Sequence, residues 1–136
     1  MSDKYNFHIG VGCWIFNPAG QILLGRRLSK HGYDTWAPPG GKIEPDEEPW
    51  NCAERELREE TGIIISAKNF HLIGVTYDAY PGKPYVTLHY RADAVTMPAK
   101  LMEPDKCAVW QWFNLNSLPK PLFLSAQNLL LSHPQL

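Results

Sequence analysis

The sequence predicts an α+β domain in which a mostly antiparallel sheet packs against helices. Three observations lead to this fold class. Short segments rich in β-forming residues recur along the chain, separated by turns that contain proline and glycine. One acidic segment has apolar residues at helical spacing, and a second apolar segment ends the chain. The length of 136 residues and the 44% hydrophobic content are typical of one globular domain with a sizeable core.

The first elements are expected to form a β-hairpin. Residues 7–16, "FHIGVGCWIF", are rich in β-forming residues, and Gly10 and Gly12 are typical of a strand that another backbone approaches closely. The turn "NPAGQ" and the run "ILLG" with its arginines predict the second strand. Residues 28–39 are interpreted as a loop that ends in "WAPP".

A helix is predicted over residues 50–61. Pro49 suits the first turn of a helix, and Gly62 is a typical residue just after the last turn. Trp50, Ala53 and Leu57 recur at helical spacing, so this face is expected to be buried.

Further strands and a final helix complete the predicted domain. The strands are expected in "IIISA", "FHLIGVTYDAY", "YVTLHYRADAV" and "AVWQWF", with the turn "PGKP" joining the second of these to the third. The segment "NSLPKPLFLSAQNLLLSH" begins with prolines and is expected to end as an amphipathic helix.

Composition excludes several functional classes. The formal charge of -1 gives no electrostatic basis for binding a nucleic-acid polymer. No apolar run is long enough to cross a membrane, and the N-terminus lacks the layout of a signal peptide. The three cysteines, Cys13, Cys52 and Cys107, are widely spaced and are expected to be free thiols in a reducing compartment. We therefore expect a cytoplasmic protein, either monomer or homodimer, with no membrane partner.

The predicted central helix gathers carboxylates on one face. Glu56, Glu59 and Glu60 stand at positions i, i+3 and i+4, where like charges repel. A hard divalent cation, Mg²⁺ or alternatively Mn²⁺, is the natural compensation for such oxygen ligands. The alternative is a solvated charged face, in which Arg55 and Arg58 pair with carboxylates one turn away.

The loop before this helix favours the metal site. Gly40-Gly41 is expected to let the backbone turn sharply and present a carbonyl to a metal or phosphate. From Gly41 to Ile63 the chain follows the pattern G-x5-E-x7-R-E-U-x-E-E-x-G-U, where U is a bulky aliphatic residue. This stretch resembles the signature box of the Nudix hydrolase family, and the flanks "TWAPPGG" and "VWQWFNLNSLP" are also similar to common Nudix flanks.

The resemblance implies a fold and a reaction. It implies an α/β/α sandwich with a mixed, mostly antiparallel sheet between helices, and a single Nudix domain over residues 1–136 with its box at 41–63. It also implies a Mg²⁺-dependent pyrophosphohydrolase of the MutT-like type. Water attacks a phosphorus of a nucleoside diphosphate linked to another group, while positioning and charge neutralisation supply most of the catalysis.

The resemblance also assigns roles within the box. Glu59 and Glu60 match its metal-binding pair, and Glu56 matches a further ligand or base-assisting carboxylate. The carbonyl of Gly40 matches a backbone ligand. Glu47 and Arg55 match an ion pair between loop and helix that shapes the site.

One position departs from the family pattern. Many relatives supply another carboxylate just before the "VWQWF"-type strand, where this chain has Lys106, Cys107 and Ala108. Glu103 or Asp105 is the candidate replacement, and the identity of the general base stays open.

Residues around the box are candidates for substrate binding. Lys42 and Arg27 can meet phosphates, Gly41 lies in the phosphate loop, and Trp36 is the aromatic residue preferred for stacking a base.

Three substrate interpretations stay open. The preferred one is hydrolysis of a (deoxy)nucleoside triphosphate to monophosphate and pyrophosphate. The second is a dinucleoside polyphosphate or ADP-ribose hydrolase, for which Tyr80 is a weak sequence marker. The third is an inactive binding module, which the intact box disfavours.

Overall fold

The computed structural model describes residues 7–136 and contains two sheets and two α-helices. The strands are β1 (His8–Ile15), β2 (Ile22–Arg27), β3 (Trp36–Ala37), β4 (Gly40–Lys42), β5 (His71–Asp78), β6 (Tyr85–Ala92) and β7 (Cys107–Phe113). The helices are α1 (Pro49–Thr61), the short 3₁₀ helix η2 (Ala67–Asn69) and α2 (Leu124–Ser132). No helix within the described range is long and apolar enough to cross a bilayer.

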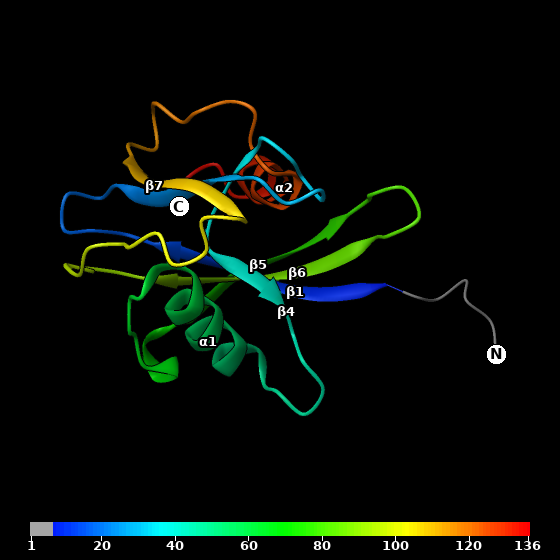
Figure 1. Ribbon diagram of the computed structural model, residues 1–136, viewed down its shortest axis with the longest axis horizontal. Helices are drawn as coiled ribbons and strands as arrows, with labels where there is room; N and C mark the ends of the chain where they lie inside the picture. Colours follow the sequence, from blue (N-terminus) through cyan, green and yellow to red (C-terminus); the bar gives the residue numbers. More distant parts are fainter. Residues whose placement is uncertain (1–6) are drawn as a thin grey trace.

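The larger sheet has the order β4-β1-β6-β5, and the smaller one has the order β3-β2-β7. Of the named strand pairs, β1 with β6 is parallel and the others are antiparallel. The two α-helices lie on opposite sides of the larger sheet (Figure 1). The predicted α+β class and mostly antiparallel pairing are therefore confirmed.

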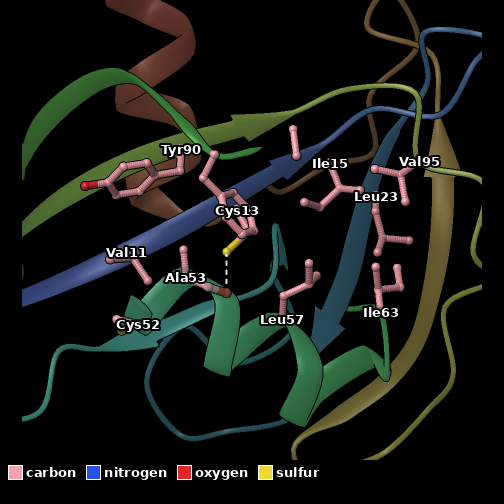
Figure 2. Close-up of a cluster of buried hydrophobic side chains, with 12 residues drawn as sticks. Val11, Cys13, Ile15, Leu23, Cys52, Ala53, Leu57, Ile63, Tyr90 and Val95 are labelled. Carbon is pink, nitrogen blue, oxygen red and sulfur yellow. Dashed lines mark hydrogen bonds between the residues drawn. The ribbon is translucent and has the colours of Figure 1, made fainter. Parts of the chain in front are cut away.

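Strand β1 directs its side chains to two separate cores. Val11, Cys13 and Ile15 are buried toward α1, where they pack with Ala53 and Leu57 (Figure 2). Trp14 and Phe16 point the other way and pack with α2 residues such as Leu129. Because successive strand residues face opposite sides of a sheet, one strand holds both helices in place.

Helix α1 ends as predicted and buries two of the three residues expected to face the core. Gly62 adopts the left-handed conformation, with φ of 75°, and its N–H bonds the carbonyl of Arg58. Ala53 and Leu57 are fully buried, together with Cys52, whereas Trp50 is 44% exposed. The expectation that Trp50 is buried was wrong: Trp50 lies one turn before Ala53, at the N-terminal end of the helix, and its ring lines a hollow on the surface.

Three further expectations need correction. Strands β1 and β2 do not form a hairpin: they belong to different sheets, and one isolated bridge, Phe16 to Ile22, forms beside the turn between them. The segment "IIISA" is not a strand: it belongs to neither sheet, and its last residue, Ala67, begins η2. The loop predicted over residues 28–39 contains β3, which pairs with β2.

Candidate active site

The acidic face of α1 lines a cavity of about 300 Å³. Glu56, Glu59 and Glu60 all contribute to its wall, and Glu103 joins them from the segment before β7. The helical spacing predicted from sequence therefore brings the three glutamates to one place, with a fourth carboxylate opposite. The Asp105 side chain is exposed and does not line this cavity. Glu103 and Asp105 differ in this way because they lie in a turn, in which the Glu103 carbonyl accepts the N–H groups of Lys106 and Cys107.

Arg55 lies at the centre of the charges on this face. Its guanidinium donates to the Glu47 carboxylate at 2.6 and 3.0 Å and thus joins the loop to the helix. It also donates to Glu56 at 2.7 Å and to Glu59 at 3.0 Å. The hydrogen bond from Arg55 lowers the pKa of Glu47 to about 2 and raises the pKa of Arg55 itself. One guanidinium thus offsets the repulsion among several carboxylates.

Glu60 is held apart from Arg55. Its carboxylate accepts the backbone N–H of Gly40 at 2.8 Å. Burial raises the pKa of Glu60 to about 8, and the nearby charges of Glu56 and Glu103 add to this rise. Burial is also the main reason that the pKa of Glu56 is raised. Both carboxylates are therefore in surroundings where their negative charge lacks full compensation.

Gly40 and Gly41 are required by close packing and not by a sharp turn. Neither has a positive φ, and both belong to β4. A Cβ at Gly40 would lie 2.1 Å from the carbonyl oxygen of Val11, and a Cβ at Gly41 would lie 2.5 Å from the carboxyl carbon of Glu56. The expected turn was therefore wrong. The two glycines let β4 approach both β1 and the acidic face of α1.

The donor set fits a hard divalent cation. All four cavity carboxylates offer oxygen ligands, and burial raises the pKa of both Glu56 and Glu60, so a bound cation would offset the cost of their buried charge. Within residues 7–136 no three His, Cys, Asp or Glu side chains already converge as a complete ligand set. Mg²⁺ needs no such set, because it usually keeps several waters and binds one or two carboxylates plus substrate phosphates.

A second cavity of about 100 Å³ adjoins the acidic one and has aromatic walls. The His31 ring lies 4.2 Å from Tyr80, 5.1 Å from Tyr85 and 5.6 Å from Phe123, measured between ring centroids. All four rings line the cavity. Flat aromatic walls of this kind suit a planar heterocycle.

Arg27 lies where the two cavities meet and lines both. Its Nε donates to the carbonyl oxygen of His31 at 2.9 Å, and its guanidinium carbon lies 4.6 Å from the Phe123 ring centroid. These contacts fix the guanidinium, and none of them uses its two terminal nitrogens. The structure thus places this predicted substrate-binding residue between the acidic and aromatic cavities.

Two other predicted substrate-binding residues, Trp36 and Lys42, do not line the acidic cavity. Trp36 lines neither cavity. Its ring centroid lies 5.2 Å from that of Phe113, beside the core that packs against α2. Strand β3 holds it there by pairing with β2, and Trp36 itself bridges Leu122. The preference for Trp36 as an exposed stacking residue therefore finds no support. Lys42 is exposed at the aromatic cavity and does not line the acidic one.

Sequence reasoning missed most of the aromatic cavity. His31, Tyr85 and Phe123 are distant in the chain and belong to no local pattern. Gly32 was an available signal, because it has a φ of 70° and an added Cβ would lie 2.4 Å from the Phe123 ring.

Comparison with known proteins agrees with this geometry. The NUDIX domain profile matches residues 6–132. An RNA pyrophosphohydrolase from Gluconacetobacter diazotrophicus is 31% identical, over 81% of this chain and 78% of its own length. An RNA pyrophosphohydrolase from Bartonella bacilliformis is 33% identical, over 81% of this chain and 79% of its own length. A crystal structure of a MutT NUDIX hydrolase from Burkholderia pseudomallei superposes with a TM-score of 0.84 at 31% identity, covering 92% of this chain and 96% of that one. The chain therefore belongs to the NUDIX family and is a hydrolase that acts on phosphorus-containing anhydrides.

Proposed function

We propose that this hydrolase converts a nucleoside or deoxynucleoside triphosphate into the monophosphate and pyrophosphate, with Mg²⁺ as its cation and Mn²⁺ as the alternative. The observation that carries the proposal is the pair of adjoining cavities, one acidic and one aromatic, joined at Arg27. The phosphates would lie over the glutamates and a single base would lie among the aromatic rings. A cytoplasmic location, which the three free cysteines favour, is part of this proposal.

The proposed reaction forms one bond and breaks one. A water oxygen attacks the α-phosphorus, and the bridging P–O bond to the β-phosphate breaks to release pyrophosphate. Glu56, Glu59 and Glu60 would hold the divalent cation, which neutralises phosphate oxygens and makes water more acidic. Arg27 would orient the phosphates, and Arg55 with Glu47 would hold the glutamates in position. A carboxylate of the acidic cavity accepts the proton of the attacking water, and Glu56, Glu60 and Glu103 are the candidates.

A second candidate is the triphosphorylated 5′ end of RNA. The relatives from Gluconacetobacter diazotrophicus and Bartonella bacilliformis favour it, because both are RNA pyrophosphohydrolases. Tyr80 favours another candidate, a dinucleoside polyphosphate hydrolase, because a tyrosine near this point of the sequence is a marker of such enzymes. Tyr80 lines the aromatic cavity.

The test is a substrate panel with products resolved by chromatography. It contains nucleoside and deoxynucleoside triphosphates, oxidised forms, diadenosine tetraphosphate, ADP-ribose, NADH and a short 5′-triphosphorylated RNA. We expect the highest kcat/KM for a mononucleotide, with pyrophosphate as product. A higher kcat/KM for the RNA, or for the dinucleotide with ATP as product, would replace the proposal by the corresponding alternative.

A further inference from the structure

The aromatic cavity has a polar end at the first turn of α2. Tyr80, Ser125 and the backbone of this turn meet there, on the face of the larger sheet that α2 covers. None of these groups has a part in the hydrolysis described above. Their unused hydrogen-bonding capacity identifies what this end of the cavity can bind.

The hydroxyl of Tyr80 is buried and has no hydrogen-bond partner in the described part of the chain. A buried hydroxyl without a partner is costly, so a ligand that accepted its hydrogen bond would remove this cost. Burial raises the pKa of Tyr80 to about 12, which keeps its proton in place at neutral pH. Because Tyr80 lines the cavity and keeps its proton, its hydroxyl can donate a hydrogen bond to an acceptor held there.

Ser125 is the second residue of α2 and is only 6% exposed, yet it lines the cavity. Its hydroxyl makes no hydrogen bond to any of residues 7–136. The residue before the helix, Phe123, provides no side-chain cap, so the first N–H groups of this nine-residue helix lack the acceptor that a serine or aspartate would supply. The end of the cavity therefore holds several donors, and the backbone ones cannot act as acceptors.

A buried carboxylate argues against an anion at this end. Asp78 also lines the cavity and is fully buried, and it accepts hydrogen bonds from Thr87 and Asn128. Both partners are neutral, and no cation pairs with Asp78 among residues 7–136. A phosphate placed beside it would meet an uncompensated negative charge. The occupant should therefore be uncharged, and the donors of Tyr80, Ser125 and the first turn of α2 favour one that presents an acceptor to them.

We propose that the α2 end of the aromatic cavity selects bases with a carbonyl oxygen on their pairing edge, the 6-oxopurines and 4-oxopyrimidines, over bases with an amino group there. The carbonyl accepts hydrogen bonds from the Tyr80 hydroxyl, the Ser125 hydroxyl and the first turn of α2. An amino group at the same place would turn its own hydrogens toward fixed N–H donors and leave them unpaired. This inference rests on the proposed function, because it assumes that the aromatic cavity holds the base.

Matched substrate pairs test the inference. ITP differs from ATP, and UTP from CTP, in having a carbonyl with an adjacent N–H in place of the amino group. We expect kcat/KM to be about 10-fold higher or more for the carbonyl member of each pair, since a site that donates hydrogen bonds rejects a donor. Equal rates within both pairs would overturn the inference.

A binding measurement separates this inference from the proposed function. The affinities of IMP and AMP are compared by calorimetry in excess EDTA, where no turnover is required. If triphosphates prove not to be hydrolysed, tighter binding of IMP still supports the inference, and equal affinity for IMP and AMP overturns it.

Two hydroxyl deletions locate the effect. Tyr80→Phe keeps the ring and should lower the ITP-to-ATP ratio of kcat/KM about five-fold, and Ser125→Ala should lower it to a similar extent. The matched controls are Tyr77→Phe and Ser132→Ala. Tyr77 has an exposed ring in β5, and Ser132 lies at the other end of α2, so both variants should leave the ratio unchanged. Unchanged ratios in both cavity variants, with unchanged melting temperatures, would contradict the assignment.

Discussion

Arg55 holds the acidic face of α1 together through contacts that no other residue of the helix duplicates. Its side chain is 18% exposed and reaches Glu47, Glu56 and Glu59 within 3.0 Å and Glu44 at 3.7 Å. Removing one partner of a shielded charge cluster leaves the others uncompensated, which costs more than the net value of any single pair.

Arg55→Ala is therefore expected to lower both stability and rate. We expect a loss of about 2 kcal/mol in the free energy of unfolding, less than for a fully buried pair because the cluster is partly hydrated. The loss of kcat should be at least ten-fold, because the freed glutamates repel one another. Chemical denaturation and steady-state kinetics measure the two effects.

Arg58→Ala is the matched control for this prediction. Arg58 lies on the exposed side of the same helix and makes no salt bridge within the described residues. Arg58→Ala should leave both the free energy of unfolding and kcat nearly unchanged. Equal effects of the two substitutions would show that the contacts of Arg55 are not what matters.

His89 is a buried histidine whose hydrogen bonds define its neutral tautomer. Its Nδ1 accepts the indole N–H of Trp14 at 2.9 Å, so the ring proton lies on Nε2, which donates to the Thr76 hydroxyl at 2.9 Å. Burial lowers the pKa of His89 from 6.5 to about 4. The unfolded chain therefore binds a proton at a higher pH than the folded protein does.

This difference predicts a pH-dependent stability with a definite sign. Between pH 6.5 and 4 the unfolded state binds more protons, so stability falls as pH decreases through this range. The full pKa difference corresponds to a loss of about 3 kcal/mol in the free energy of unfolding.

His89→Gln should be less stable at pH 7 and should lose less stability than the wild type between pH 7 and 4.5, as measured by urea denaturation. His71→Gln, at an exposed position of β5, should keep the wild-type slope. A wild-type slope in His89→Gln would show that other groups cause the acid sensitivity.

Among the secondary-structure elements, β4 has the tightest steric limits at the site. A Cβ at Gly40 would strike the carbonyl of Val11, which is backbone, whereas one at Gly41 would strike the end of the Glu56 side chain. A backbone atom cannot move without moving its strand, but a side chain can turn aside. The same substitution should therefore act differently at two neighbouring positions.

We expect Gly40→Ala to cost about 2 kcal/mol of stability or more. Gly41→Ala should change the melting temperature little but lower kcat at least ten-fold, because it displaces the Glu56 carboxylate. Gly20→Ala, in a turn with a φ of 78° and no atom within 4 Å of the added carbon, should cost about 1 kcal/mol with full activity. Thermal melts and kinetics on the three variants measure this. Equal losses at Gly40 and Gly41 would contradict the distinction.

Elements with a strong local pattern were predictable from sequence, and those that depend on tertiary partners were not. Pro49 and Gly62 mark the ends of α1, and the spacing of Glu56, Glu59 and Glu60 specifies one helix face. The segment "IIISA" has high β-propensity, but no neighbouring strand is available to it, so it stays outside both sheets. The break between β1 and β2 is also invisible locally, because the turn residues fit a hairpin whether or not the strands stay paired.

At the scale of the whole molecule, the site arises where distant parts of the chain meet. The acidic cavity takes side chains from α1, backbone from β4 and Glu103 from the segment before β7. Its α1 carboxylates were predictable because the family pattern lies in one stretch. The aromatic cavity combines residues of six strands, β1 to β6, with loop residues and the start of α2, so most of its lining was predictable only from the three-dimensional structure.

Because the acidic cavity joins separate elements, a cation bound there should stabilise the whole domain. A ligand that binds only the folded state adds about 2.7 kcal/mol at 100 times its dissociation constant. We expect saturating Mg²⁺ to raise the melting temperature by about 5 °C or more, and excess EDTA to reverse this rise and abolish turnover.

Glutamine substitutions test whether the α1 carboxylates are responsible for this stabilisation. Glu59→Gln and Glu60→Gln should lose most of the Mg²⁺-induced rise and several orders of magnitude in kcat, while their melting temperatures in EDTA stay at or above that of the wild type. The metal-free proteins should not be weakened because each substitution removes a repelling charge, and in Glu60→Gln the new amide oxygen can still accept the Gly40 N–H. Glu54→Gln is the matched control, since Glu54 lies on the same helix outside the cavity and accepts the N–H of Ala67. It should keep the full Mg²⁺ response. Full turnover in EDTA, or an undiminished Mg²⁺ response in the Glu59 and Glu60 variants, would show that these carboxylates do not bind the cation.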